Sequence, residues 1–199
     1  MSAIRRPQAV VLAGPNGAGK TSAAPELLRD AVGIGAFVNA DIIAQGLSGF
    51  SPQSAAFEAG RAMLHRLQEL ARERTNMAFE STLSGRSAHQ FLIEIRASGY
   101  DVHIFYLWLP TPELAVSRVH QRVQSGGHDV PDAVVRRRFW KSLVNFDRLY
   151  RPITASWQMF DGSSVVGRPL IARGMGESVP IVLDASRWIT VQNMIKEAQ

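Results

Sequence analysis

Eight consecutive residues, 14–21, read Gly-Pro-Asn-Gly-Ala-Gly-Lys-Thr and fit the pattern G-x-x-x-x-G-K-[ST]. The glycines of this pattern let the backbone turn tightly and bring its N–H groups onto phosphate oxygens. Lys20 places a positive charge between the outer phosphates, and the Thr21 hydroxyl is the usual ligand for the Mg²⁺ that accompanies a nucleotide. We therefore expect nucleotide contacts from Gly14, Asn16, Gly17, Ala18, Gly19, Lys20 and Thr21, with Thr21 as the metal ligand.

Two carboxylates follow short apolar runs farther along the chain. Asp41 comes after residues 36–39, and Glu80 ends residues 77–80. If both runs are parallel strands, their carboxyl ends lie at the sheet edge where ligands bind. Phosphoryl transfer to a hydroxyl needs a base that accepts the hydroxyl proton and a metal that spreads the developing charge. We expect Asp41 to be this base and Glu80 to position the acceptor or a metal-bound water. The structural alternative for Asp41 is the cap of a helix that begins at Ile42.

Arginines on both sides of a Gly-Gly pair indicate a lid over residues 118–140. Arg118 and Arg122 are four residues apart, so they share one face of a predicted helix. Residues 136–138, all arginine, follow the glycines. A lid of this kind excludes water and brings arginines to the transferring phosphoryl group. Because consecutive helical residues point about 100° apart, at most one or two of these three arginines can face a nucleotide.

The elements that must position these residues alternate between strand and helix, which indicates an α/β fold with a mostly parallel sheet of five or six strands. We expect the chain to form a single domain over residues 1–199. The predicted strands are 8–13, 36–39, 77–80 and 101–109, with 158–160 and 181–183 as a last strand and an edge hairpin. The predicted helices are 54–72, 86–98, 112–123, 131–150 and 185–196. Pro25 should kink or shorten the helix that follows the phosphate loop.

The composition excludes several classes of protein. Of the 199 residues, 46% are hydrophobic and none is cysteine, which argues against disorder and excludes disulfides and cysteine metal sites. No run approaches 18 apolar residues, so we expect no membrane span. The first strand begins so early that no room remains for a signal peptide, and we expect a cytoplasmic protein.

The net charge of +5 and the pI of about 10.2 are typical of nucleic-acid-binding proteins. However, the arginines are spread along the chain, and a triphosphate site also needs positive charge. We therefore do not expect nucleic acid as a partner, although a nucleic-acid kinase or ATPase stays open as a third interpretation.

In combination, several motifs resemble the zeta-toxin-like P-loop kinases, in particular their compact chromosomal branch with a Gly-Gly-His lid. These motifs are the phosphate loop, Phe-Val-Asn-Ala-Asp, Phe-Glu-Ser-Thr-Leu-Ser-Gly, the arginine-flanked Gly-Gly-His segment and Arg-Arg-Arg-Phe, and they extend to about Tyr150. The resemblance implies a P-loop kinase fold like that of the nucleoside monophosphate kinases. Zeta toxins phosphorylate UDP-activated amino sugars such as UDP-N-acetylglucosamine at the 3′-hydroxyl, using ATP or GTP with Mg²⁺. A small antitoxin protein blocks their nucleotide site.

The resemblance also assigns roles to individual residues. Lys20 and Thr21 match the residues that bind the nucleotide and the metal, and Asp41 matches the base. Glu80 and Thr82 match the substrate-side E-x-T element. Arg122, with either Arg136 or Arg137, matches the lid arginines, and we count Lys20, Arg122 and Asp41 as catalytic. The Asp-Asn-Ser element of the family is represented here by residues 161–163, Asp-Gly-Ser, in which the asparagine is lost.

These observations predict a kinase that transfers the γ-phosphoryl group to an alcohol group of a small molecule. The alternative is a nucleotide-binding switch or ATPase module of a toxin–antitoxin-like system, without a small-molecule acceptor. The paired carboxylates favour the kinase, because a switch needs no base to activate a hydroxyl. ABC-type ATPases share the phosphate loop, but their Leu-Ser-Gly-Gly-Gln signature is absent from the sequence.

Overall fold

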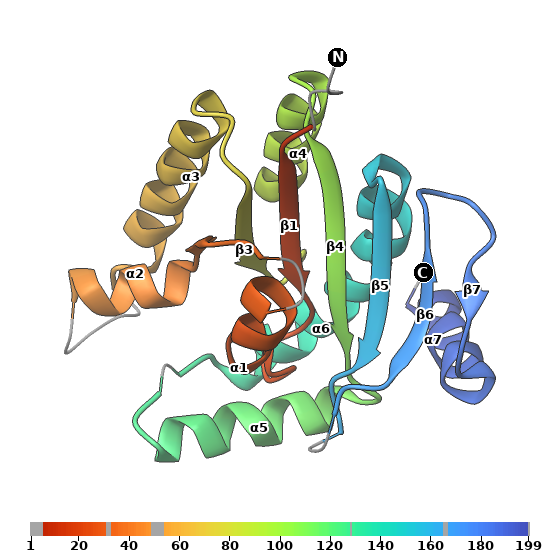
Figure 1. Cartoon of the computed structure of the whole chain (residues 1–199). Helices are drawn as coiled ribbons and strands as arrows, with labels where there is room; N and C mark the ends of the chain where they lie inside the picture. The colour runs from red at the N-terminus through yellow and green to blue at the C-terminus, as the bar shows by residue number, and fades with distance from the viewer. Residues whose placement is uncertain (1–5, 31–32, 49–53, 128, 165–166, 199) are drawn as a thin grey trace.

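A seven-stranded sheet, in the order β2-β3-β1-β4-β5-β6-β7, runs through the molecule (Figure 1). This computed structural model describes the chain apart from residues 1–5, 31–32, 49–53, 128, 165–166 and 199. The first five strands in this order are parallel, and the last two pair antiparallel to their neighbours. The strands are β1 Gln8–Ala13, β2 Ala36–Val38, β3 Met77–Ser81, β4 Asp101–Trp108, β5 Ser156–Asp161, β6 Leu170–Gly174 and β7 Ile181–Val182.

Helices cover both faces of the sheet: α1 lies in front of it in the view of Figure 1, and α4 and α6 lie behind. None of the helices in the described residues is long and apolar enough to cross a membrane. The helices are α1 Lys20–Ala24, α2 Ala40–Leu47, α3 Ala56–Arg72, α4 Ser87–Ala97, α5 Pro112–Gln124, α6 Asp132–Asn145 and α7 Ala185–Glu197. Two π-helical segments, Pro25–Asp30 and Phe146–Tyr150, continue α1 and α6.

The central strands are apolar on both faces because helices bury both faces of a parallel sheet. All residues of β1 after Gln8 are buried. Aromatic rings fill the core beneath β5, where the rings of Trp157 and Trp188 stack with centroids 5.9 Å apart and the ring of Phe146 meets that of Trp157 edge-on. This packing joins α7 and the end of α6 to the same sheet.

The α/β fold with a mostly parallel sheet is confirmed, but the expected count of five or six strands is too low. β6, the strand without a predicted counterpart, is a five-residue strand whose sequence, Leu-Ile-Ala-Arg-Gly, shows no clear period of two. Pro25 ends the α-helical part of α1 as expected, because proline has no N–H to donate to the preceding turn. The predicted helix over 131–150 changes from α to π geometry at Phe146.

The strand order brings three chain segments together at one edge of the sheet. β3 lies between β2 and β1, and Ala13 at the end of β1 is level with Ser81 at the end of β3. The loop after β1, the residue after β2 and the end of β3 are therefore neighbours. Ligands of open α/β sheets bind at this carboxyl edge.

Candidate active site

The loop between β1 and α1 packs against the protein backbone so closely that glycine is required at two positions. Gly14 has a φ of 137°, and a Cβ there would lie 2.3 Å from the carbonyl oxygen of Leu107. Gly17 has a φ of 77°, and its Cβ would lie 2.6 Å from the carbonyl oxygen of Ala115. Real Cβ atoms do not approach backbone that closely. The loop is thus held between the end of β4 and helix α5.

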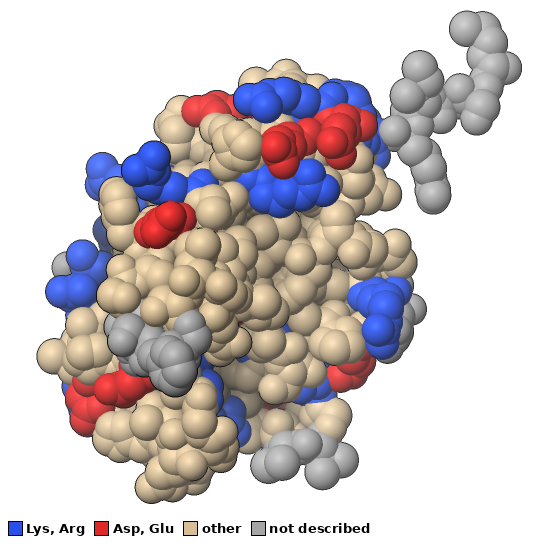
Figure 2. All heavy atoms as spheres, turned by 90° about the vertical axis from the view of Figure 1, so that its left-hand side faces the viewer, with Lys and Arg blue, Asp and Glu red and all other residues tan. Residues whose placement is uncertain are grey.

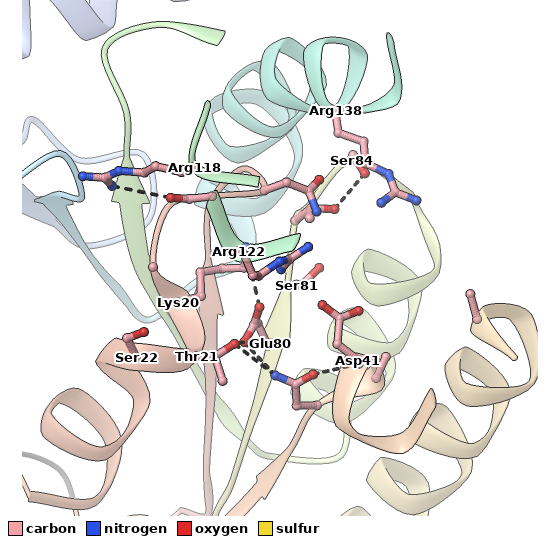
Figure 3. Close-up of a pocket in the computed structure, with 17 residues that line it drawn as sticks. Lys20, Thr21, Ser22, Asp41, Glu80, Ser81, Ser84, Arg118, Arg122 and Arg138 are labelled. Carbon is pink, nitrogen blue, oxygen red and sulfur yellow. Dashed lines mark hydrogen bonds and ion pairs between the residues drawn. The ribbon is translucent and has the colours of Figure 1, made fainter. Parts of the chain in front are cut away.

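Side chains from the three neighbouring segments form one hydrogen-bonded network (Figure 3). Thr21 Oγ1 donates to Glu80 Oε2 at 2.8 Å, and Asn39 Nδ2 donates to the same oxygen at 2.8 Å. Lys20 Nζ lies 3.6 Å from Glu80 Oε1 and donates to the carbonyl oxygen of Pro15 at 2.9 Å. Glu80 is therefore the common acceptor that ties the loop to β2 and β3.

Asn39, and not Asp41, caps helix α2. The Asn39 side chain accepts from the backbone N–H groups of Asp41 and Ile42, at 2.8 and 3.3 Å. The alternative interpretation of Asp41 as the helix cap was therefore wrong. Asp41 lies in the first turn of α2, and its half-buried side chain lines a cavity at the carboxyl edge of the sheet. Asparagine is among the preferred capping residues because its side-chain oxygen reaches the first free N–H groups of the helix.

A cavity of about 510 Å³ lies over this network. It brings together most of the residues that the sequence singled out, from the phosphate loop, the ends of β2 and β3, and α5. Among the described residues, Gly14 and Ala18 do not line the cavity. Gly14 packs against the backbone of Leu107, and Ala18 is buried. The predicted residues that line the cavity are Asn16, Gly17, Gly19, Lys20, Thr21, Asp41, Glu80, Thr82, Arg118 and Arg122.

The Lys20 ammonium carries the clearest electrostatic perturbation in the cavity. Burial lowers the pKa of Lys20 from its ordinary value, and the Glu80 and Asp41 carboxylates act in the opposite direction. A buried ammonium is costly unless anionic groups surround it. Lys20 is therefore poised to receive further negative charge from a ligand.

The arginines of α5 serve two different parts of the site. Arg122 projects into the cavity beside Lys20 (Figure 3). Arg118 Nη1 donates to the carbonyl oxygen of Gly162 at 2.5 Å, and its Nη2 donates to that of Ser163 at 2.8 Å. A longer bond of 3.4 Å joins Arg118 to the carbonyl of Gly17. Arg118 thus connects the phosphate loop to the turn after β5.

Of the three consecutive arginines on α6, the structure brings Arg138 to the cavity and leaves the other two outside. Arg136 is exposed and pairs with Glu113 of α5, and Arg137 is exposed to solvent. Arg138 is half-buried, lines the cavity and lies near Ser84 (Figure 3). The resemblance favoured Arg136 or Arg137 for the lid, and the geometry does not place either there. The choice depends on how α6 is rotated, which the arginine run does not encode.

Sequence reasoning also missed Asn39, Ser81 and Ser84 as part of the site. Asn39 could have been found, because an asparagine directly before a helix is a capping signal. Ser81 lines the cavity from the end of β3, and Ser84 lines it from the turn that follows. Small hydroxyl residues in a loop are too common to be singled out without coordinates.

A parallel sheet with a glycine-rich loop, a buried lysine and a threonine at its carboxyl edge defines the class of P-loop α/β proteins with a kinase-like fold. Residues 10–139 match the family described as AAA domain (AAA_33), and the chain belongs to this family. An uncharacterized protein of Haemophilus influenzae is 30% identical over 136 residues, which are 68% of this chain and 95% of that protein.

Two solved structures that share this fold cover nearly the whole chain. The AvrRxo1-ORF1:AvrRxo1-ORF2 complex with sulphate ions superposes with a TM-score of 0.70 at 18% identity, covering 94% of this chain and 63% of that chain. The present chain thus spans less than two thirds of that relative. The PezAT chromosomal toxin–antitoxin system of Streptococcus pneumoniae superposes with a TM-score of 0.65 at 14% identity, covering 99% and 89%. At these identities, the likeness establishes the fold.

Proposed function

We propose that the protein is a kinase that uses ATP or GTP with Mg²⁺ to phosphorylate a hydroxyl group of a small molecule. The observation that carries the proposal is a cavity in which the Asp41 carboxylate faces the phosphate-loop Lys20 and the predicted lid arginine Arg122. A base opposite a phosphate cradle is the arrangement that phosphoryl transfer to an alcohol requires.

In this mechanism Asp41 accepts the proton of the acceptor hydroxyl as its oxygen attacks the γ-phosphorus. The bond from the γ-phosphorus to the bridging oxygen breaks, and the nucleoside diphosphate leaves. Lys20, Arg122 and Arg138 stabilise the negative charge on the transferring group. Glu80 holds Thr21 and Asn39 in place through its hydrogen bonds.

The residues at the carboxyl edge of the sheet fit a nucleotide with its metal ion. Mg²⁺ prefers oxygen ligands, and the Thr21 hydroxyl at the start of α1 would supply one. No cluster of three metal-binding side chains occurs in the described residues, so the nucleotide phosphates would complete the coordination. The ion would neutralise charge on the phosphates. Asn16 Oδ1 is buried without a hydrogen-bond partner in the described part of the chain, which suits a site that a ligand completes.

For the acceptor we propose a sugar nucleotide such as UDP-N-acetylglucosamine, with Thr82 and Glu80 on the acceptor side of the cavity. The resemblance to zeta toxins and the likeness in fold to the PezAT system support this proposal. On the same grounds we propose a small antitoxin protein as the partner of this chain. Co-purification with a small protein encoded beside it would test that partner.

Replacement of the base tests the proposed chemistry. We expect Asp41→Asn to lower kcat for transfer from γ-labelled ATP by about 10²- to 10⁴-fold, the usual contribution of a general base, with ATP affinity retained. Labelled transfer to a panel of sugar nucleotides is the measurement. Asp101→Asn is the matched control, because Asp101 is the first residue of β4 and lies at the end of the strand away from the cavity.

Two results would contradict this assignment. Full turnover by Asp41→Asn on the true acceptor would exclude Asp41 as the base. ATP hydrolysis by the wild-type protein, without transfer to any acceptor in the panel, would support the ATPase module instead. A switch would instead bind a partner differently with ATP and with ADP.

A further inference from the structure

Helix α6 changes geometry at its C-terminal end. It is α-helical over Asp132–Asn145 and π-helical over Phe146–Tyr150. Single π turns within longer helices are rare and are enriched at functional sites. Pro152 has no N–H, and its ring crowds the carbonyl group of residue 148, so it ends regular helix geometry but does not select the contacts that the π segment makes.

The π turn brings two side chains to the same side of the helix. In an α-helix, residues five apart point about 140° away from each other, since each step is about 100°. In a π-helix the bonds run from residue i to i+5, so the turn is wider and residues five apart point in more similar directions. Asn145 and Tyr150 are separated by five residues across this segment. Both can therefore reach one neighbouring loop.

That loop is the turn after β3, which lines the cavity. Asn145 Nδ2 donates to the carbonyl oxygen of Leu83 at 2.7 Å. The Tyr150 hydroxyl donates to the carbonyl oxygen of Gly85 at 2.9 Å. Burial raises the pKa of Tyr150 to about 12, so its hydroxyl keeps its proton and remains a donor at neutral pH. Two carbonyl groups on either side of Ser84 are thus held from one helix.

The held turn has a conformation that a leucine does not adopt freely. Leu83 has a φ of 55°, in the left-handed region, and its side chain is buried. Its N–H donates to Ser81 Oγ at 3.0 Å, and the hydroxyls of Thr82 and Ser84 lie 2.8 Å apart. Backbone of this kind persists where surrounding contacts impose it, and it often marks a ligand site.

The same face of α6 reaches the cavity. Arg138 lies seven residues before Asn145, which is two helical turns along the same face. Between them, Ser142 is fully buried and shares a hydrogen bond of 2.9 Å with the Tyr106 hydroxyl of β4. This buried bond, with the buried apolar side chains of α6, holds the helix in one rotation against the sheet. The helix therefore places Arg138 and the turn after β3 relative to each other.

We propose that Asn145 and Tyr150 are positioning residues that hold the turn 83–85 and thereby orient Thr82 and Ser84 toward the phosphoryl acceptor. The hydroxyls act on the acceptor, and the two helix residues act through the backbone that carries these hydroxyls. The effect on catalysis rests on the kinase function proposed above, whereas the restraint of the turn does not depend on it.

The experiment uses the full chain with two variants and two matched controls. Asn145→Asp keeps the shape but replaces the donor with an oxygen that repels the Leu83 carbonyl, and Asn193→Asp makes the same change on the exposed side of α7. Tyr150→Phe removes one hydroxyl. Tyr100→Phe removes a hydroxyl that also bonds backbone carbonyls, those of Leu70 and Thr75, away from the cavity.

Three quantities are measured: hydrogen exchange of peptides covering 82–86 and 14–21, the affinity for Mg-ATP, and KM for the acceptor. We expect Asn145→Asp and Tyr150→Phe to raise exchange in 82–86 and not in 14–21, with ATP affinity within about two-fold. A displaced turn should raise the acceptor KM by about ten-fold or more, since shifts near 1 Å cost up to about 100-fold in rate. Both controls should leave all three quantities unchanged.

The outcomes separate the two proposals. Unchanged exchange in 82–86 would overturn the positioning role, and so would an ATP affinity that falls as steeply as the acceptor KM rises. Equal effects in Tyr100→Phe would also overturn it, because they would reflect lost stability alone. If the wild-type protein phosphorylates no acceptor but exchange responds as expected, the kinase function fails and the restraint of the turn stands.

Discussion

Asn39 caps helix α2, and Asp41 faces the cavity. The Asn39 amide caps α2 through its oxygen and bonds Glu80 through its nitrogen. Both hydrogen-bonding ends of the amide are thus engaged. Asp41 is left to face the cavity with its carboxylate, as the proposed base must.

Arg138 can be tested against its own neighbour. We expect Arg138→Ala to lower kcat by about 10²- to 10³-fold, as the loss of one charge-stabilising donor does. Arg137→Ala removes the same side chain one residue earlier, where it is exposed, and should leave kcat within about two-fold. Steady-state transfer from labelled ATP is the measurement. Equal losses in both variants would show that overall charge, and not the position of Arg138, matters.

The sequence predicted the phosphate loop at the level of single residues because each position in it has one chemical requirement. It predicted Asp41 and Glu80 because each ends or follows an apolar strand. It could not select Arg138 from three consecutive arginines, since the rotation of α6 depends on buried contacts, among them the hydrogen bond between Tyr106 and Ser142. Both of these hydroxyl residues look unremarkable in the sequence.

The phosphate loop can pack between β4 and α5 because Gly14 and Gly17 carry no side chain. We expect Gly14→Ala to abolish ATP binding, because its Cβ would lie 2.3 Å from the Leu107 carbonyl oxygen. Gly19→Ala meets no atom within 4 Å and bears only the strain of a φ of 81°. It should weaken ATP binding by about ten-fold or less. Calorimetric titration with Mg-ATP distinguishes the two, and tight binding by Gly14→Ala would refute the packing argument.

Helix α7 is tied to the site through its first turn. Arg187 pairs with the buried Asp161 carboxylate at 2.9 Å, and Asp161 also accepts from the Ser163 N–H. The carbonyl oxygens of Gly162 and Ser163, in the turn after β5, accept hydrogen bonds from Arg118. The first turn of α7 is thus connected to Arg118 through Asp161 and the turn after β5.

The cap of α7 should make stability depend on pH. The Arg187 N–H, the Ser186 hydroxyl and the Arg187 side chain lower the pKa of Asp184 to about 2 from its ordinary 3.8. Because the folded-state pKa is depressed, the contribution is complete above about pH 4 and is lost as the pH falls through about 2. We expect Asp184→Ala to lower Tm by about 2–4 °C at neutral pH and by less toward pH 2. A difference in Tm that does not depend on pH would contradict the assignment.

The predicted elements were most accurate where period and boundary residues agreed, as in 8–13 for β1. They were least accurate in the C-terminal third, where β6 is a short antiparallel strand. The π turn after Asn145 left no trace in the sequence, because its residues suit an α-helix equally well.

The face shown in Figure 2 carries charged side chains of both signs and no single basic patch. On that face, basic and acidic side chains alternate at the upper end, and a broad uncharged surface lies below. The cavity, in contrast, gathers Lys20, Arg118, Arg122 and Arg138 against two carboxylates. Positive charge is therefore concentrated where a triphosphate would bind.

Binding at this site should stabilise the entire fold. At a Mg-ATP concentration of 100 Kd, linkage adds about 2.7 kcal/mol, which corresponds to a rise in Tm of about 5–11 °C for a chain of this size. Lys20→Met should lose most of this rise, while Lys196→Met on α7 should keep it. Thermal unfolding with and without Mg-ATP is the measurement. A full rise in Lys20→Met would exclude the phosphate loop as the binding site.

The turn after β3 is held by its carbonyl groups, and this has a consequence for how acceptor preference can change. Asn145 and Tyr150 contact backbone oxygens, which every residue type possesses. Side chains at positions 82 and 84 can therefore be exchanged while both restraints remain. The rigidity of the turn therefore does not depend on the side chains that it carries. A change of acceptor would require new side chains at these positions, while the fold and both restraints stay the same.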